Sequence, residues 1–301
     1  MFEFMSESPT TDRIAFIGLG MMGYPLAGRL AGAGFPLAIF DLNSAALESF
    51  AGEFPCRICS TAIQAVADCE VVVTMLPTSN DVFAAVLGND LSPGIVSVLK
   101  PGTVVIDMSS CDPLRTRELA AVLAERRITL VDAPVSGGVK KAREGSIAIM
   151  FGGSAETLER CRPMLAAMGS SIVHTGGVGS GHAMKALNNY VSAAGLVAVV
   201  EALRVGERFG LDPKIMTQVL NASSGKNNTT ENKVAQYMLS GTFNSGFALS
   251  LMTKDIGIAM HLAEQLEIPT QLGHSCLDIW RAAAEKADRS ADHTEMYKIG
   301  I

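Results

Sequence analysis

A glycine-rich turn near the N-terminus constrains the fold of this chain more than any other feature. The apolar run Ile14–Ile17 is typical of a buried strand, and it leads directly into Gly18-Leu19-Gly20-Met21-Met22-Gly23. A helical pattern follows from Met22 to Ala33 and ends at Gly34. In this context the turn lets backbone N–H groups approach a pyrophosphate at the helix N-terminus. The alternative is a turn that serves packing alone. The predicted cofactor-binding residues are Gly18, Leu19, Gly20, Met21, Met22 and Gly23.

An acidic residue follows the second predicted strand, Leu37–Phe40. This residue, Asp41, lies 18 residues past Gly23. A carboxylate there can accept hydrogen bonds from ribose hydroxyls and would repel a 2′-phosphate. The next residues, Leu42-Asn43, offer no Arg for such a phosphate. The pattern therefore predicts NAD rather than NADP as the cofactor, the alternative being an Asp that only caps the next helix.

Apolar strands alternate with helical patterns as far as residue 177. Val71–Met75 is apolar except for one Thr, which suits a parallel sheet covered on both faces. Repeated βα units imply an α/β fold with a doubly wound parallel sheet, the Rossmann arrangement, over residues 1–177. The further predicted strands are Val104–Asp107, Thr129–Asp132, Ile147–Phe151 and Ser171–His174, and the predicted helices are Thr61–Ala67, Asn80–Leu87, Pro113–Arg126 and Ala155–Met168.

The pattern changes after Gly181. His182–Phe209 contains no Pro and predicts one helix about 40 Å long. Its middle, Val191–Val200, is apolar on every side, so we expect it to be buried all round, and it is too short to span a bilayer. The sequence thus predicts an all-helical C-terminal domain, residues 178–301, begun by a long interdomain helix. The other predicted helices are Pro213–Leu220, Thr229–Leu239, Ser250–Gln265 and Thr270–Lys286.

The composition excludes several classes of protein. With 48% hydrophobic and 18% charged residues over 301 positions, the chain can build buried cores. Its net charge is −6, which does not indicate the basic surface that nucleic-acid binding needs. Met1–Asp12 holds three acids and no Lys or Arg, unlike a signal or transit peptide. We therefore expect a cytoplasmic protein that binds neither nucleic acid nor membrane.

Cysteine and histidine spacing does not indicate a metal site. Cys56 and Cys59 form a lone CxxC with no second pair nearby, so we expect free thiols. The five histidines have no ligand spacing, and the prediction is that no metal is bound.

Several loops fall where ligands of such sheets bind. Leu76-Pro77 and Ser109-Ser110 follow strands, so Leu76, Pro77 and Ser110 should border the cofactor. Ser110 could alternatively cap the helix that begins at Pro113. Ser136-Gly137-Gly138 follows another strand, and adjacent N–H groups in such a turn can bind a carboxylate. The alternative for this turn is an ordinary polar loop.

The long helix opens with a lysine among small and apolar residues. Lys185 and Asn189 are four residues apart and share a helix face. Desolvation would lower the pKa of this lysine from about 10.4 toward ~7–8, which suits proton transfer. The alternative is a lysine whose head reaches solvent. His182 is a rival base, but we interpret it as a helix-start residue.

Four segments, in order, resemble the β-hydroxyacid dehydrogenase family. They are Gly18–Gly23, the stretch from Asp132 to Gly138, the stretch from Gly181 to Asn189, and Lys254-Asp255. The resemblance covers nearly the whole chain from Arg13, and the family includes 3-hydroxyisobutyrate dehydrogenases and tartronate semialdehyde reductases. It implies NAD-dependent oxidation of the 3-hydroxyl of a small anionic 3-hydroxy acid to a semialdehyde, or the reverse. It implies Lys185 as catalytic acid/base, Asn189, Ser136, Gly137 and Gly138 as substrate-binding, Leu76, Pro77, Ser110 and Lys254 at the cofactor, and a homodimer or homotetramer built on the helical domain.

One loop departs from that family. Members that act on 3-hydroxyisobutyrate carry an aromatic residue where this chain has the polar stretch from Ser223 to Thr230, with one cation, Lys226. This favours a more hydroxylated or more anionic substrate, the alternative being a solvated loop. Two other functions remain open: a non-catalytic NAD(P)-binding module, and reduction of a different small carbonyl or imine, although imine-reducing relatives usually lack the Lys.

Overall fold

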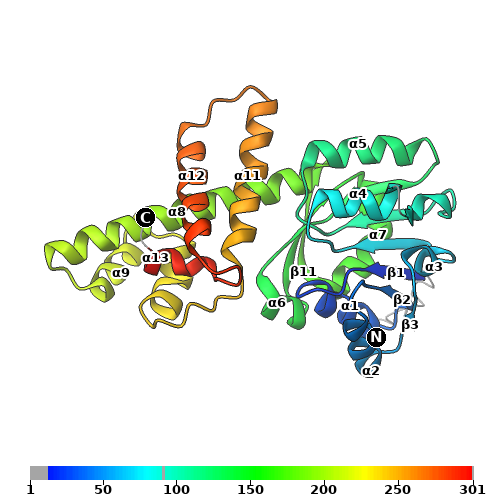
Figure 1. The fold of residues 1–301 in the computed structure, drawn as a ribbon, viewed down its shortest axis with the longest axis horizontal. Coiled ribbons are helices and arrows are strands. Elements are labelled where there is room, and N and C mark those ends of the chain that lie inside the picture. The colour runs from blue at the N-terminus through cyan, green and yellow to red at the C-terminus, as the bar shows by residue number, and fades with distance from the viewer. Residues whose placement is uncertain (1–12, 90–91, 300–301) are drawn as a thin grey trace, which may run out of the picture. The chain divides into compact units, whose positions relative to one another are not determined.

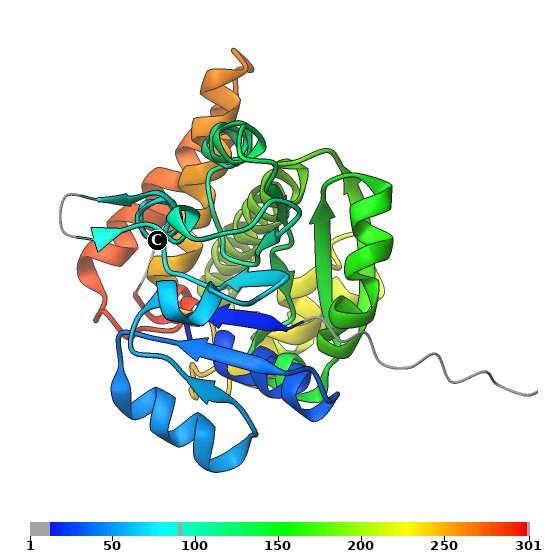
Figure 2. The same ribbon diagram turned by 90° about the vertical axis from the view of Figure 1, so that its right-hand side faces the viewer.

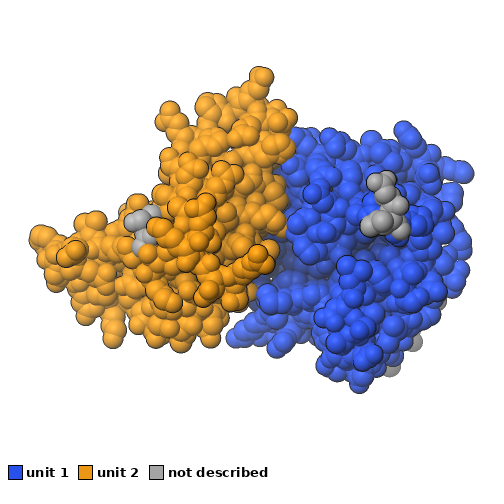
Figure 3. Space-filling model, viewed as in Figure 1, with its two compact units in different colours: residues 1–185 blue, residues 186–301 orange. Residues whose placement is uncertain are grey.

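The structure, a computed structural model, describes residues 13–89 and 92–299. The segment Met1–Asp12, expected to carry no targeting signal, lies outside the described residues. By its contacts the chain divides between Lys185 and Ala186 into two compact units, which Figure 3 colours separately. The domain boundary was predicted near residue 177, before the helix Ser180–Phe209. The first residues of that helix, up to Lys185, belong to unit 1.

Unit 1 is built on one large sheet (Figure 1). Its strand order is β11-β10-β8-β7-β4-β1-β2-β3, with β9 paired to β10. The run from β3 to β8 is parallel throughout, as the doubly wound prediction requires. The strands are β1 (Ile14–Ile17), β2 (Leu37–Phe40), β3 (Arg57–Ile58), β4 (Val71–Thr74), β7 (Val104–Asp107), β8 (Thr129–Asp132), β9 (Val135–Ser136), β10 (Ile147–Gly152) and β11 (Gly169–Gly176).

The last strands of this sheet correct the expectation of a wholly parallel sheet. β10 runs antiparallel to β8 and to β9, while β11 is parallel to β10. The connection from β9 to β10 contains only the seven-residue helix α6 (Gly138–Glu144). That helix is too short to return the chain to the start of the sheet, so the chain comes back as a hairpin and reverses direction.

Helices cover both faces of the sheet (Figure 2). Successive strand residues point to opposite faces: Phe16 and Val73 enter one core, and Ala15 and Val72 enter the other. The first core also takes residues of α1 (Gly23–Gly32), α2 (Ser44–Glu53) and α7 (Ala155–Met168). The second takes residues of α3 (Ala62–Val66), α4 (Ser79–Leu87), η1 (Ile95–Ser97) and α5 (Pro113–Ala124), and a short hairpin of β5 (Gly88–Asn89) and β6 (Ser92–Pro93) follows α4.

Unit 2 is all-helical in its described residues, as predicted. Its core surrounds the fully buried Trp280. The expected helix Thr229–Leu239 is instead a short α-helix followed by a π-helical turn. The elements are α8 (Ser180–Phe209), which begins in unit 1, α9 (Pro213–Ala222), α10 (Asn228–Asn232), η2 (Val234–Met238), α11 (Leu249–Gln265), α12 (Gln271–Lys286), η3 (His293–Glu295) and α13 (Met296–Ile299).

The long helix α8 is continuous, but it is not buried all round. Within the stretch expected to be buried, Leu196 and Val200 are fully buried, whereas Val191 is 68% exposed. Only one face of the helix packs into the helical core. The expectation of full burial was wrong because an apolar sequence does not reveal how many neighbours surround a helix.

By length and composition alone α8 could also cross a membrane. It has 30 residues, and the most apolar window has a mean hydropathy of 1.3. The expectation that this region is too short to span rested on its ten-residue middle. Since 44% of the window is buried within the protein, we interpret α8 as a core helix.

Candidate active site

The glycine turn leaves room for a ligand at one position and none at two others. Gly18 has a φ of +99°, and a Cβ there would lie 2.3 Å from the carbonyl oxygen of Met75. A Cβ on Gly23 would lie 1.9 Å from the oxygen of Gly18. By contrast, a Cβ on Gly20 would meet nothing within 4 Å. Since no side chain caps the N-terminus of α1 either, this turn fits a pyrophosphate that approaches at Gly20.

Asp41 stands at the end of β2 and holds the same turn. Its Oδ2 accepts a hydrogen bond from the Leu19 N–H at 2.6 Å, and its Oδ1 accepts one from the Asn43 N–H at 2.7 Å. Helix α2 is capped by the side chain of Asn43, so the capping alternative for Asp41 is wrong. Each carboxylate oxygen keeps a lone pair that can accept from a ribose hydroxyl.

Two strand ends beside the turn are joined by polar side chains. Asp107, at the end of β7, accepts from the Thr74 hydroxyl at 2.9 Å and from the Ser109 N–H at 3.1 Å. The Ser109 hydroxyl oxygen accepts from the Leu76 N–H at 2.9 Å. The predicted cofactor residue Leu76 is thereby held beside Gly18. Sequence reasoning missed Asp107, although a buried acid that ends an apolar strand was a visible signal.

The loops after β4 and β7 contain two further predicted cofactor residues. Pro77 follows Leu76 directly, and half-buried Ser110 follows Ser109. Helix α5 is capped by Asp112, whose Oδ1 accepts from the Leu114 N–H at 2.8 Å. Ser110 is therefore not the cap of that helix.

The Ser-Gly-Gly segment is a tight turn from strand to helix rather than an irregular loop. Ser136 ends β9, and Gly137 and Gly138 have φ values of +140° and +74° before α6 continues. Residues with side chains rarely adopt such values, so the turn needs glycine. A Cβ on Gly138 would meet nothing within 4 Å, and no side chain caps α6.

Lys185 lies near the start of α8. Its residue surface is only 8% exposed, although the flanking Met184 and Leu187 are 44% and 41% exposed. This burial does not fit the alternative in which the ammonium head reaches bulk solvent.

Asn189 lies one turn further along α8, within unit 2, and is tied to α11. It is 6% exposed, and its Nδ2 donates to the carboxylate of the buried Asp255 at 2.6 Å. Its Oδ1 accepts from the amide of Asn188 at 3.1 Å. The ammonium of Lys254 is 3.9 Å from the same Asp255 carboxylate. Asp255 was missed as an orienting group, because its partner is distant in sequence.

Comparisons with known proteins cover the described chain almost completely. Residues 13–176 match the family model of the NAD binding domain of 6-phosphogluconate dehydrogenase. Residues 179–299 match the model described as NAD-binding of NADP-dependent 3-hydroxyisobutyrate dehydrogenase. The Bos taurus mitochondrial 3-hydroxyisobutyrate dehydrogenase is 35% identical over 95% of this chain and 86% of that protein. The Eubacterium barkeri 2-(hydroxymethyl)glutarate dehydrogenase is 36% identical over 95% of this chain and 94% of that protein.

A solved structure of Mycobacterium tuberculosis 3-hydroxyisobutyrate dehydrogenase with L-serine superposes with a TM-score of 0.87. It is 31% identical, and the match covers 96% of this chain and 99% of that chain. The chain belongs to the β-hydroxyacid dehydrogenase family. It is accordingly an NAD-dependent oxidoreductase that acts on the hydroxyl group of a small 3-hydroxy acid, as the resemblance implied.

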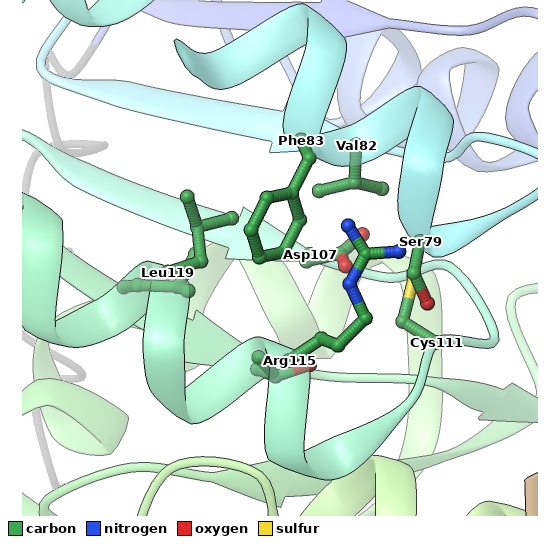
Figure 4. A pocket seen from close by; sticks show the side chains of 9 residues that line it. Ser79, Val82, Phe83, Asp107, Cys111, Arg115 and Leu119 are labelled. Carbon is green, nitrogen blue, oxygen red and sulfur yellow. The ribbon is translucent and has the colours of Figure 1, made fainter.

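One further cluster in this dehydrogenase has metal-ligating residue types. The ligand atoms of Asp107, Cys111 and His182 lie within 4.8 Å of one another, and Figure 4 shows the first two among the residues that line a small cavity, together with Arg115. Both ring nitrogens of His182 are already hydrogen-bonded, to the Thr116 hydroxyl and to the Ser109 carbonyl. This cluster therefore offers no ring nitrogen to an ion, and the absence of a metal stays a prediction.

The CxxC segment contains thiols that are not joined. Cys56 and Cys59 are both free and are separated by the extended residues of β3. An extended backbone places their Cα atoms about 10 Å apart, beyond the span of a disulfide.

Proposed function

We propose that Lys185 carries the proton in this dehydrogenase. Its Nζ takes the proton of the substrate 3-hydroxyl as the carbinol carbon is oxidised to a semialdehyde, and returns it in the reverse reduction. NAD, when bound, supplies the hydride acceptor. The burial of Lys185, the last residue of the cofactor-binding unit, supports the proposal, since proton transfer there would take place away from bulk solvent.

Substrate binding is proposed for two sets of groups. The N–H groups of the turn Ser136-Gly137-Gly138 would hold the substrate carboxylate, as uncapped N–H groups in a glycine turn can. Asn189 would orient the hydroxyl, since an amide nitrogen has two N–H donors and Asp255 takes one of them. Cofactor binding is proposed for the glycine turn, Asp41, Leu76, Pro77, Ser110 and Lys254.

We propose a substrate with a polar substituent rather than a methyl group. The loop from Ser223 to Thr230 is polar, and its cation Lys226 is paired with Glu231 at 2.8 Å. Because that charge is already balanced, the loop favours a hydroxylated or amino-bearing acid over a second carboxylate. The M. tuberculosis relative was solved with L-serine, which has this character.

A homo-oligomer is proposed as well, a dimer or tetramer built on the helical unit. Large apolar side chains are exposed toward both ends of α8, and others are exposed on α9. Exposed apolar surface is typical of protein interfaces. The residues are Leu187, Val191, Val205 and Phe209 on α8, and Ile215 and Val219 on α9.

We also propose a cytoplasmic location and a domain boundary near residue 177.

The role of Lys185 is tested by Lys185→Ala. We expect a folded protein that binds NADH but whose kcat falls at least ~100-fold, the usual contribution of general acid–base catalysis. Added ethylamine should restore part of the rate, because it replaces the missing amine. The control is Lys214→Ala, an exposed lysine on α9. Near-normal turnover of Lys185→Ala would contradict the role.

The substrate is tested by NADH formation with 3-hydroxyisobutyrate, glycerate, threonate, serine and 3-hydroxypropionate. We expect the hydroxylated or amino-bearing acids to have the highest kcat/KM. Silence across this panel with intact NADH binding would favour the non-catalytic module, and turnover of a cyclic imine alone would favour the reductase alternative.

A further inference from the structure

His182 occupies an unusual place for a polar side chain. It lies in the first turn of α8 and is 1% exposed, so its imidazole is removed from water completely. Burying a polar ring is unfavourable unless its nitrogens find partners. Both nitrogens have one: Nδ1 is 2.8 Å from the Thr116 hydroxyl, and Nε2 is 3.1 Å from the Ser109 carbonyl oxygen.

The partners fix the orientation of the ring. A carbonyl oxygen accepts only, so Nε2 must donate its proton to Ser109. The carboxylate of Asp107 lies 3.8 Å from Nε2, and that of Asp132 lies 3.9 Å from Nδ1. Interchanging the two nitrogens or rotating the ring would break both hydrogen bonds and leave buried polar atoms unpaired.

The backbone of the same residue is held equally firmly. The His182 N–H donates to Asp132 Oδ2 at 2.7 Å, and the Gly179 N–H donates to Oδ1 at 2.6 Å. Burial raises the pKa of Asp132, and the nearby imidazole and these two donors oppose that rise. A Cβ on Gly181 would lie 2.3 Å from the oxygen of Met150, so a glycine is needed for this close approach.

One residue thus fastens the first turn of α8 to three elements. Its N–H bonds the end of β8, its Nε2 bonds the segment after β7, and its Nδ1 bonds α5. The segment after β7 contains Ser110, to which we assign cofactor binding. Lys185 is three residues further along the same helix, about 60° around it and 4.5 Å along it.

We propose that His182 is a positioning residue that sets the rotation of α8 about its axis and thereby holds the amine of Lys185 in register with the cofactor-bearing strand ends. The inference rests on the proposed role of Lys185. The hydrogen bonds of the His182 side chain and of its N–H point in different directions. Together they allow the start of α8 only one rotation about the helix axis. A misplacement of about 1 Å at a reacting group is enough to lower a rate ~100-fold.

Three variants separate positioning from mere packing. His182→Phe keeps a ring but removes both hydrogen bonds. His182→Gln can place an amide N–H near the position of Nε2, and His182→Asn can place one near Nδ1. His274→Gln, an exposed position on α12, is the matched control. The measurements are kcat, KM for NAD and for the acid, the pH profile of kcat, and Tm.

We expect His182→Phe to lower kcat about 100-fold, with KM values changed less than about 5-fold and a displaced pH profile. His182→Gln should recover most of that loss, because the bond to Ser109 joins the helix to the cofactor side. A lowered Tm with unchanged kcat and pH profile in the folded fraction of every variant would show a structural role only and overturn the proposal.

A double substitution keeps this inference separate from the role of Lys185. In the Lys185→Ala background, His182→Phe should reduce the residual turnover no further, because the group it positions is absent. An equal loss in both backgrounds would overturn positioning through Lys185 while leaving the proton-transfer role intact. Normal turnover of Lys185→Ala alone would instead overturn the proton-transfer role.

Discussion

At the scale of single residues, Gly18 and Gly20 of the same turn have different roles. Gly18 needs its positive φ and the space beside Met75, whereas Gly20 leaves space that the protein itself does not fill. A sequence motif treats them alike, because it records only that both positions lack a side chain. The structure separates a glycine that the fold requires from one that the ligand requires.

We therefore predict different outcomes for alanine at these two positions. Gly18→Ala should lower the free energy of unfolding by more than ~2 kcal/mol, because it adds strain and a backbone clash. Gly20→Ala should leave Tm within about 2 °C and weaken NADH binding ~10-fold, since its methyl group enters the pyrophosphate space. Differential scanning fluorimetry and NADH fluorescence titration measure the two effects. Equal loss of stability in both variants would contradict the assignment.

At the scale of elements, the helical unit contains two buried titratable groups near η3, His293 and Lys233. Burial, with a further contribution from the charge of Lys233, lowers the pKa of His293 to about 4. The Nδ1 of His293 lies 3.0 Å from the carbonyl oxygen of Phe247 and donates to it. Burial also lowers the pKa of Lys233 to about 8. Burial thus disfavours the charged form of each group, and at acid pH His293 stays neutral down to about pH 4 while Lys233 is charged.

The sign of the resulting pH dependence follows from proton binding. Between about pH 6.5 and 4 the unfolded chain binds a proton at His293 that the folded chain does not, so stability falls as the pH falls through this window. His293→Asn, which can keep the bond to Phe247, should flatten that part of the Tm profile. His274→Asn should leave it unchanged. An unaltered acid slope in His293→Asn would contradict the prediction.

At the scale of the whole molecule, the exposed apolar residues of α8 and α9 favour association with a second copy of the chain. We predict that the wild-type protein is a dimer or tetramer and that Val191→Glu or Val205→Glu shifts it toward monomer, since a buried charge opposes association. Val173→Glu, at an exposed position on β11, is the control. Light scattering after size exclusion measures the mass, and a monomeric wild type would contradict the oligomer.

The sequence by itself determined what depends on neighbours along the chain: the glycine turn, the alternation of strands and helices, the unbroken α8, and the placing of Lys185 and Asn189 on one helix. These follow from backbone sterics and from the periods of strands and helices. Only the tertiary structure decided the reversed direction of β10, the single buried face of α8, and the partners of Asn189 and His182. Those partners lie 66 and 73 residues away, at Asp255 and Ser109. Such pairs are chosen by packing across elements, which no local pattern in the chain encodes.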